Sequence, residues 1–150
     1  MVVTLKIDGC AVRDVAAVTY SFNRTTDIEG LPTSIPRGGK IVIRVKAMND
    51  GNPELLGWMT QGITKKGSIE FMDSRDVCKL TKSVDFENAY CIDFVEHWED
   101  VPYNQNNITL AHWEEITISC QKIVNGLITY ENLTNLRFLD NYGTQGNIKN

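Results

Sequence analysis

The residues best suited to chemistry in this sequence are its two histidines and the cysteine and carboxylates near them. His97 and His112 lie in two expected strands, together with Cys91, Glu96 and Glu114. All are residue types that bind zinc, but zinc sites show compact ligand spacings, and none is present here. We therefore expect no metal site, and we expect both histidines to be hydrogen-bonded instead.

The patterns of covalent and phosphate chemistry are also missing from the sequence. No GxSxG motif or reactive-cysteine signature occurs. Glu114 and Glu115 point to opposite faces of an expected strand and cannot flank one bond. Gly38 and Gly39 lack the lysine context of a P-loop. We expect neither an enzyme nor a bound cofactor.

Composition predicts a single compact domain. The 150 residues are 42% hydrophobic and 23% charged, with a net charge of -4, so a sizeable core is expected and nucleic acid is a poor main partner. The N-terminal residues lack a signal peptide's features, and no apolar run is long enough to cross a bilayer. We expect synthesis in the cytoplasm, no membrane insertion and, in any export, no cleaved signal peptide.

The four cysteines are far apart and form no CxxC pair, which is typical of reduced, half-buried thiols. They are Cys10, Cys78, Cys91 and Cys120.

Alternation of apolar and polar residues with a period of two dominates the chain and predicts strands. Expected strands cover residues 3–7, 12–22, 41–47, 69–71, 78–86, 89–98 and 107–122. In the second of these, Val12, Ala16, Val18, Tyr20 and Phe22 would share the inner face. In the last, His112 and Glu114 interrupt the apolar row, which predicts a bulge or bend there.

One helix is expected, from Pro53 to about Ile63. Asn52 would cap it, and Leu55, Leu56 and Met59 would share its apolar face. The elements together predict a mainly β fold, an antiparallel barrel or sandwich of about seven or eight strands with one lateral helix.

The segment from Asn23 to Gly39 has no periodicity. A loop of this length is uncommon in a compact domain unless it is functional or disordered. Pro32 and Pro36 stiffen it, and its apolar residues would favour contact with another surface. We interpret it as an intermolecular arm; a loop folded over its own barrel end is the alternative.

Four segments follow one another along the chain: Gly30-Leu-Pro-Thr-Ser34, Pro36-Arg-Gly-Gly39, Leu56-Gly-Trp-Met59 and Asn88-Ala-Tyr-Cys91. In this order they resemble the tube protein of type VI secretion, the haemolysin-coregulated protein (Hcp) family, in its divergent branch. The resemblance covers roughly residues 3–122.

The resemblance implies a non-enzymatic β-barrel that forms six-membered rings, which stack into a tube. In this family a contractile sheath encloses the tube, a spike protein sits at its tip, and effector proteins can travel in its lumen. The long loop would then reach the neighbouring ring, a role that we map onto Thr25, Ile28, Gly30, Leu31, Pro32, Ser34, Ile35, Pro36, Arg37, Gly38 and Gly39.

A ring also needs lateral and lumenal surfaces. Unpaired strand edges are natural lateral contacts. Lys40, Arg44 and Lys46 form the polar face of one strand and would line the lumen or a lateral contact; a solvated outer face is the alternative. The expected packing anchors of helix and strands, in the core or an interface, are Leu55, Trp58, Met59, Tyr90 and Trp113.

Residues 1–122 are expected to form the barrel domain. Residues 123–150 would be an extension, part strand or short helix and part mobile tail, with an added strand near Leu127–Tyr130. Two other functions stay open, a small barrel module that binds a hydrophobic ligand and a phage tail-tube protein.

Overall fold

The computed structural model describes residues 1–48, 50–76, 79–99 and 112–132. This part of the chain contains seven strands and one helix: β1 (Val2–Ile7), β2 (Arg13–Tyr20), β3 (Lys40–Lys46), α1 (Glu54–Gln61), β4 (Thr64–Met72), β5 (Leu80–Trp98), β6 (His112–Asn125) and β7 (Ile128–Glu131).

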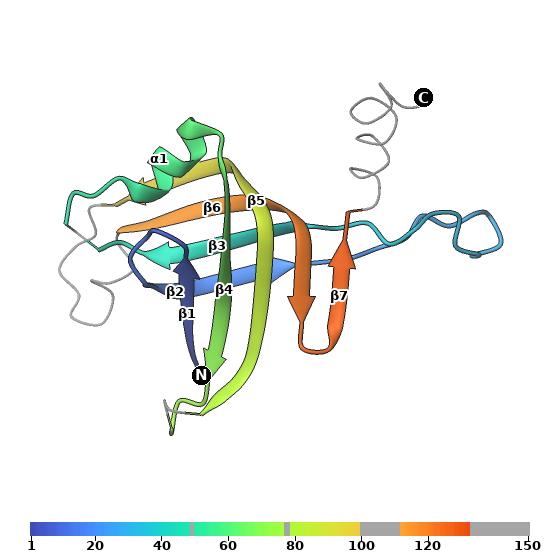
Figure 1. Cartoon of the computed structure of the whole chain (residues 1–150), viewed down its shortest axis with the longest axis horizontal. Coiled ribbons are helices and arrows are strands. Elements are labelled where there is room, and N and C mark those ends of the chain that lie inside the picture. The colour runs from blue at the N-terminus through green and yellow to red at the C-terminus, as the bar shows by residue number, and fades with distance from the viewer. Residues whose placement is uncertain (49, 77–78, 100–111, 133–150) are drawn as a thin grey trace, which may run out of the picture.

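Six strands form a closed antiparallel barrel, as Figure 1 shows. Their order is β3-β2-β1-β4-β5-β6, and β3 pairs back onto β6 from Lys40↔Ser119 to Lys46↔Trp113 without a register shift. The short strand β7 pairs with β6 at Lys122–Asn125, beyond the part of β6 that β3 covers. The expected mainly β, antiparallel barrel with a lateral helix is confirmed.

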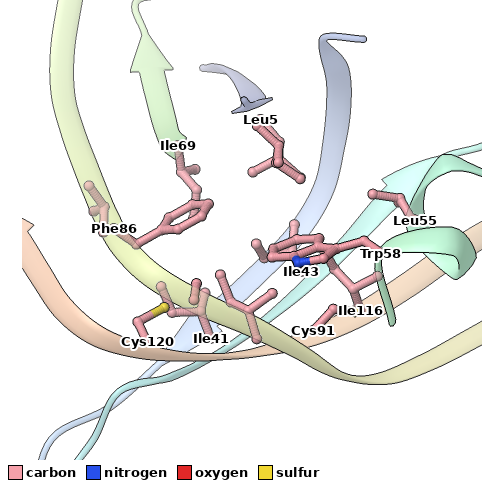
Figure 2. Packing of buried hydrophobic residues seen from close by; sticks show 14 of the residues in the cluster. Leu5, Ile41, Ile43, Leu55, Trp58, Ile69, Phe86, Cys91, Ile116 and Cys120 are labelled. Carbon is pink, nitrogen blue, oxygen red and sulfur yellow. The ribbon is translucent and has the colours of Figure 1, made fainter. Parts of the chain in front are cut away.

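The barrel interior is filled by apolar side chains from all six strands and the helix. Figure 2 shows Leu55 and Trp58 of α1 directed into the same interior as Ile43 and Ile116. The fully buried large side chains are Trp58, Phe86, Leu5, Ile41, Ile43, Leu55, Ile69, Ile116, Ile118, Ile123, Val45 and Val84. The Trp58 indole N–H donates to the Ile63 carbonyl at 2.9 Å, so this bulky anchor has its polar group satisfied.

Helix α1 differs from expectation at its start and on its buried face. Pro53, not Asn52, occupies the N-cap position, and no side chain caps the helix. Its buried residues are Leu55 and Trp58, whereas Leu56 is 39% exposed. The helix ends at Gly62, which adopts the left-handed conformation that favours glycine.

Strand β2 presents only part of the expected inner face: Val18 and Tyr20 pack against the core, whereas Ala16 and Phe22 are exposed. The buried side chain near its start is Arg13, and Val12 is exposed. A register shift between Val15 and Ala17 then changes the phase, so that Val18 packs against the core in the second half. Arg13 is tolerated inside because its guanidinium pairs with Glu114 and donates to the Lys46 carbonyl at 3.0 Å.

The two strands expected at 78–86 and 89–98 are one continuous strand, β5. Within it the inward positions shift from Phe86 to Ala89, and Asn88 between them has a positive φ of 51°. The bulge expected in β6 lies instead in β5, where the register with β6 shifts between Cys91 and Asp93. Alternation alone cannot tell which of two paired strands carries the extra residue.

At the C-terminal end, β6 continues to Asn125, so residues 123–125 still pair with β5, and β7 follows at Ile128–Glu131 and pairs with β6. The boundary at 122/123 stays a prediction. Cys78, the start of the strand expected at 107, and the tail at 133–150 lie outside the described residues.

Gly39 stands where barrel closure begins. Its carbonyl accepts a hydrogen bond from the Cys120 N–H at 2.6 Å, and its φ is +95°. A Cβ at this position would lie 2.7 Å from the Cys120 carbonyl oxygen. The backbone approach of β3 to β6 therefore requires glycine here.

We expect Gly39→Ala to lower the free energy of unfolding by several kcal/mol, about 1–3 from backbone strain and the remainder from displacing β6. Gly30→Ala is the matched control, because Gly30 also has a positive φ of +86° but has nothing within 4 Å of the added Cβ. Urea unfolding compares the two variants. Equal losses of unfolding free energy in the two variants would show that the close approach of Gly39 to Cys120 does not contribute to stability.

The buried ion pair yields a second prediction. Glu114→Leu leaves the Arg13 charge buried and unpaired, which costs about 3–5 kcal/mol of unfolding free energy. The double variant Arg13→Leu with Glu114→Leu should recover most of that loss. Glu115→Leu removes only the partly exposed partner of Arg44 and should cost at most about 1 kcal/mol. A similar loss for both single variants in urea unfolding would contradict the assignment.

Candidate functional site

The segment between β2 and β3, residues 21–39, forms a hairpin that we call the arm. Figure 1 shows it projecting from one end of the barrel, away from the body. Antiparallel bridges join Asn23 to Arg37 and Thr26 to Pro32. The Asn23 N–H donates to the Arg37 carbonyl at 2.8 Å, and the Thr33 N–H donates to the Thr25 carbonyl at 2.7 Å. The segment expected to be irregular is thus a hairpin held by its own hydrogen bonds.

The tip of the arm is a tight turn that exposes apolar side chains. The Asp27 carboxylate accepts hydrogen bonds from the N–H groups of Glu29 and Leu31, both at 2.9 Å. The Gly30 N–H donates to the Asp27 carbonyl at 3.0 Å. Ile28 is fully exposed and Leu31 is 57% exposed. Two apolar side chains therefore stand on a turn whose geometry is locally fixed.

Side-chain hydrogen bonds stiffen the middle of the arm. The Ser34 hydroxyl accepts from the Thr25 N–H at 2.9 Å and donates to the Ile35 carbonyl at 2.9 Å. The hydroxyls of Thr25 and Thr33 are 2.9 Å apart. Ile35 is half-buried, whereas Pro32, Pro36 and Arg37 are exposed. The predicted arm residues therefore lie together, but they do not form one uniform apolar surface.

The base of the arm packs on the barrel end. The Phe22 ring lies 4.9 Å from the Tyr130 ring of β7 and 6.3 Å from the Tyr20 ring. A Cβ added to Gly38 would lie 2.5 Å from Phe22. Gly38 and Gly39 thus have roles within their own subunit, and their replacement would disturb the fold as well as any outer contact.

The outward face of β3 carries Lys40, Arg44 and Lys46, as expected, but it is not simply basic. The Arg44 guanidinium lies 3.9 Å from the centre of the Trp113 ring and 3.3 Å from the Glu115 carboxylate. On this side of the sheet, acidic side chains of the neighbouring strand compensate part of the positive charge.

The five predicted anchors divide between the interior and the outside. Leu55 and Trp58 are buried, and Met59 packs against the core. Tyr90 is 48% exposed, because its neighbours Ala89 and Cys91 take the inward positions. Trp113 is half-buried on the outer face, where the His97 ring stacks on it at 4.9 Å.

The histidine and cysteine residues considered for chemistry in the sequence have structural environments here. His112 Nε2 lies 2.8 Å from the Glu96 carboxylate. Burial raises the pKa of the Cys91 thiol to about 11 and that of Cys120 to about 12, and it also raises the pKa of Cys10. These thiols are protonated and unreactive at neutral pH. Across the described ranges, no three metal-binding side chains gather into one site.

A hollow at the other end of the barrel was not anticipated from the sequence. Its lining combines residues of β2, the β3–α1 connection, α1, β5 and β6, among them Arg13, Met48, Leu56, Phe94 and Glu114. No local pattern could have found it, because these residues become neighbours only when the barrel closes.

None of the helices in the described part of the chain has both the length and the apolar character needed to cross a bilayer.

Comparison with known proteins gives a consistent result. A family model for the hemolysin coregulated protein Hcp (TssD) matches residues 1–133. No curated protein sequence gives a match. Among solved structures, Hcp1 from Flavobacterium johnsoniae is similar with a TM-score of 0.76 and 28% identity, over 88% of this chain and 100% of that chain.

Two further structures share the fold at low identity. A mutant of the Hcp1 protein from E. coli has a TM-score of 0.68 and 17% identity, over 88% of this chain and 98% of that chain. Hcp1 from Salmonella typhimurium has a TM-score of 0.65 and 11% identity, over 89% of this chain and 95% of that chain. Because the family model spans most of the sequence and the barrel, helix and arm are all in place, the chain belongs to the haemolysin-coregulated protein (Hcp, TssD) family, the tube proteins of type VI secretion.

Proposed function

We propose that this chain is a structural subunit of the inner tube of type VI secretion. Six copies form a ring, the rings stack, and contraction of a surrounding sheath expels the tube from the cell with a spike protein at its tip. Effector proteins travel in the lumen. In this proposal the chain acts through self-association and carries no catalytic group.

The arm is the observation that carries the proposal. Beyond its base, its backbone is hydrogen-bonded within itself, from the Asn23–Arg37 bridge to the Thr26–Pro32 bridge. Its tip nevertheless exposes Ile28 completely and Leu31 substantially. These apolar side chains are exposed to water on a preformed projection, and covering them with another surface lowers the free energy of the system. In a stack of rings, that surface belongs to the next ring.

Ring closure requires two different side surfaces on each copy, and the barrel offers two different edges. The pairing of β2 with β1 is confined to Arg13 and Asp14, so within the described part of the chain the later residues of β2 have no strand partner on that side. On the other flank, β5 has no described strand partner on its β4 side beyond Tyr90. These edges bound the sheet β2-β3-β6-β5. We infer that the edge of one copy docks against the other edge of its neighbour.

That docking would turn the outer face of this sheet toward the lumen. The face carries Lys40, Arg44 and Lys46 on β3, with Glu115 on β6 and Asp93 on β5 in neighbouring rows. A mixed, partly compensated charge suits a channel that must pass effectors of different composition, because strong fields of one sign would retain oppositely charged cargo.

The ligand-binding alternative gains no support from the interior. Trp58, Phe86 and the aliphatic side chains around them fill the barrel with well-buried contacts. A module for a hydrophobic ligand would need an enclosed apolar space there instead.

The proposal predicts a native particle of six times the 16.9 kDa chain mass. Native mass spectrometry of the full chain at several concentrations measures it. A strictly monomeric protein at the highest concentration would contradict ring formation.

Deletion of Thr25–Ser34 tests the arm separately from the ring. Asn23 and Arg37 already pair across the arm, so a short turn between them can close the hairpin without disturbing β2 or β3. We expect rings of this variant with unchanged circular dichroism and melting temperature, but loss of stacked particles in electron micrographs. Stacks at the wild-type level would remove the role assigned to the arm.

A further inference from the structure

The hollow at the end of the barrel opposite the arm has a volume of about 170 Å³. Met48, Leu56 and Phe94 supply its apolar lining, and Met48 and Leu56 are 44% and 39% exposed. A cavity of about 150 Å³ is large enough to hold one benzene molecule. The hollow therefore has room for one branched apolar side chain, but not for a folded segment.

The charged groups around the hollow each have a polar partner. Arg13 pairs with Glu114, the Glu96 carboxylate contacts His112, and Asp50 accepts a hydrogen bond from the Asn52 N–H at 3.0 Å. The occupant therefore need not carry a strong compensating charge, and apolar contact is the main gain that the hollow offers.

One polar group in the lining lacks a partner. Arg13 is 4% exposed, and its Nε has no hydrogen-bond partner. A buried donor without an acceptor costs free energy. An occupant that brings an oxygen acceptor beside its apolar side chain would remove that cost. The orphaned donor points to a polypeptide turn rather than a purely apolar molecule.

The arm tip has this composition. Ile28 is the fully exposed apolar side chain, and no hydrogen bond within the described residues engages the Glu29 carboxylate. Figure 1 shows the arm at one end of the long axis and the hollow-lining connection before α1 at the other end. A copy displaced along that axis therefore presents its hollow toward the tip of the preceding copy.

We infer that the hollow receives the Ile28 side chain of a second copy of this chain, with an oxygen of the inserted turn accepting from Arg13 Nε. The inference rests on the proposed function and deepens it, because it names the surface that the arm meets. The contact is heterologous, since the arm tip of one copy and the hollow of the next are different surfaces. Because such a contact repeats along the axis without closing, it yields an open-ended stack.

Crosslinking tests the receptor directly. A p-benzoyl-phenylalanine in place of Leu31, which is 57% exposed on the same turn, leaves Ile28 and Glu29 free to insert and reports their neighbours after irradiation of assembled full-length protein. We expect crosslinks between copies to residues 47–56 and to the peptide around Phe94. The same crosslinker in place of Leu127, which is also fully exposed, is the matched control and should not label these peptides.

Substitutions test how much the burial of Ile28 contributes to association between rings. Burying a side chain of this size contributes roughly a factor of ten to a hundred in affinity, so Ile28→Asp should weaken ring–ring association at least tenfold, with the ring mass unchanged. Leu56→Arg should have the same effect from the other side of the contact. Ile28→Val should stack nearly as wild type, and Leu127→Asp is the control for an added surface charge.

The outcomes separate this inference from the proposed function. Crosslinks from the tip to a different surface, or to none, in protein that still forms stacked rings would overturn the hollow as receptor and leave the tube proposal standing. Stacking that is insensitive to Ile28→Asp would do the same. Wild-type protein that forms no rings would overturn both.

Discussion

The pairing of β3 with β6 is the constraint on which the rest of this structure depends. It closes the barrel through an uninterrupted ladder from Lys40↔Ser119 to Lys46↔Trp113. At one end, the ladder brings Gly39 against Cys120 and so fixes where the arm leaves the body. At the other end, it brings Glu114 to Arg13, and the hollow forms around that pair. One set of backbone hydrogen bonds thereby positions both ends of the subunit.

The two ends differ in how they are stabilised, and this difference suits assembly. The body is held by a well-buried apolar interior with one compensated ion pair. The arm has no core; it is held by backbone bonds, the Asp27 turn and the Ser34 and Thr25 hydroxyls. A preformed arm loses less conformational entropy on docking than an unstructured loop would, so more of the apolar contact free energy remains for association.

Much of the fold could be predicted from the sequence, because alternation in segments such as Ile41–Val45 reflects burial directly. The errors about which β5 side chains face inward have one cause: a period of two carries no information on bulges. The positive φ of Asn88 and the extra β5 residue opposite Thr117 both change which side chains face inward. The burial of Arg13 could not be predicted, because a charged residue is expected on the surface. The only sign of it in the sequence is that its partner Glu114 interrupts the apolar row of β6. The arm could be located from its prolines and its lack of periodicity, but its hairpin pairing could not. The hollow joins five elements and has no sequence signature.

Electron cryomicroscopy of the self-assembled full chain tests the central claim most directly, because it shows where the arm lies among identical copies. The account predicts closed rings in which the arm leaves its own barrel and contacts the adjacent ring. A map of the assembly in which residues 25–34 lie against their own subunit, with no contact between layers through Ile28, would contradict it.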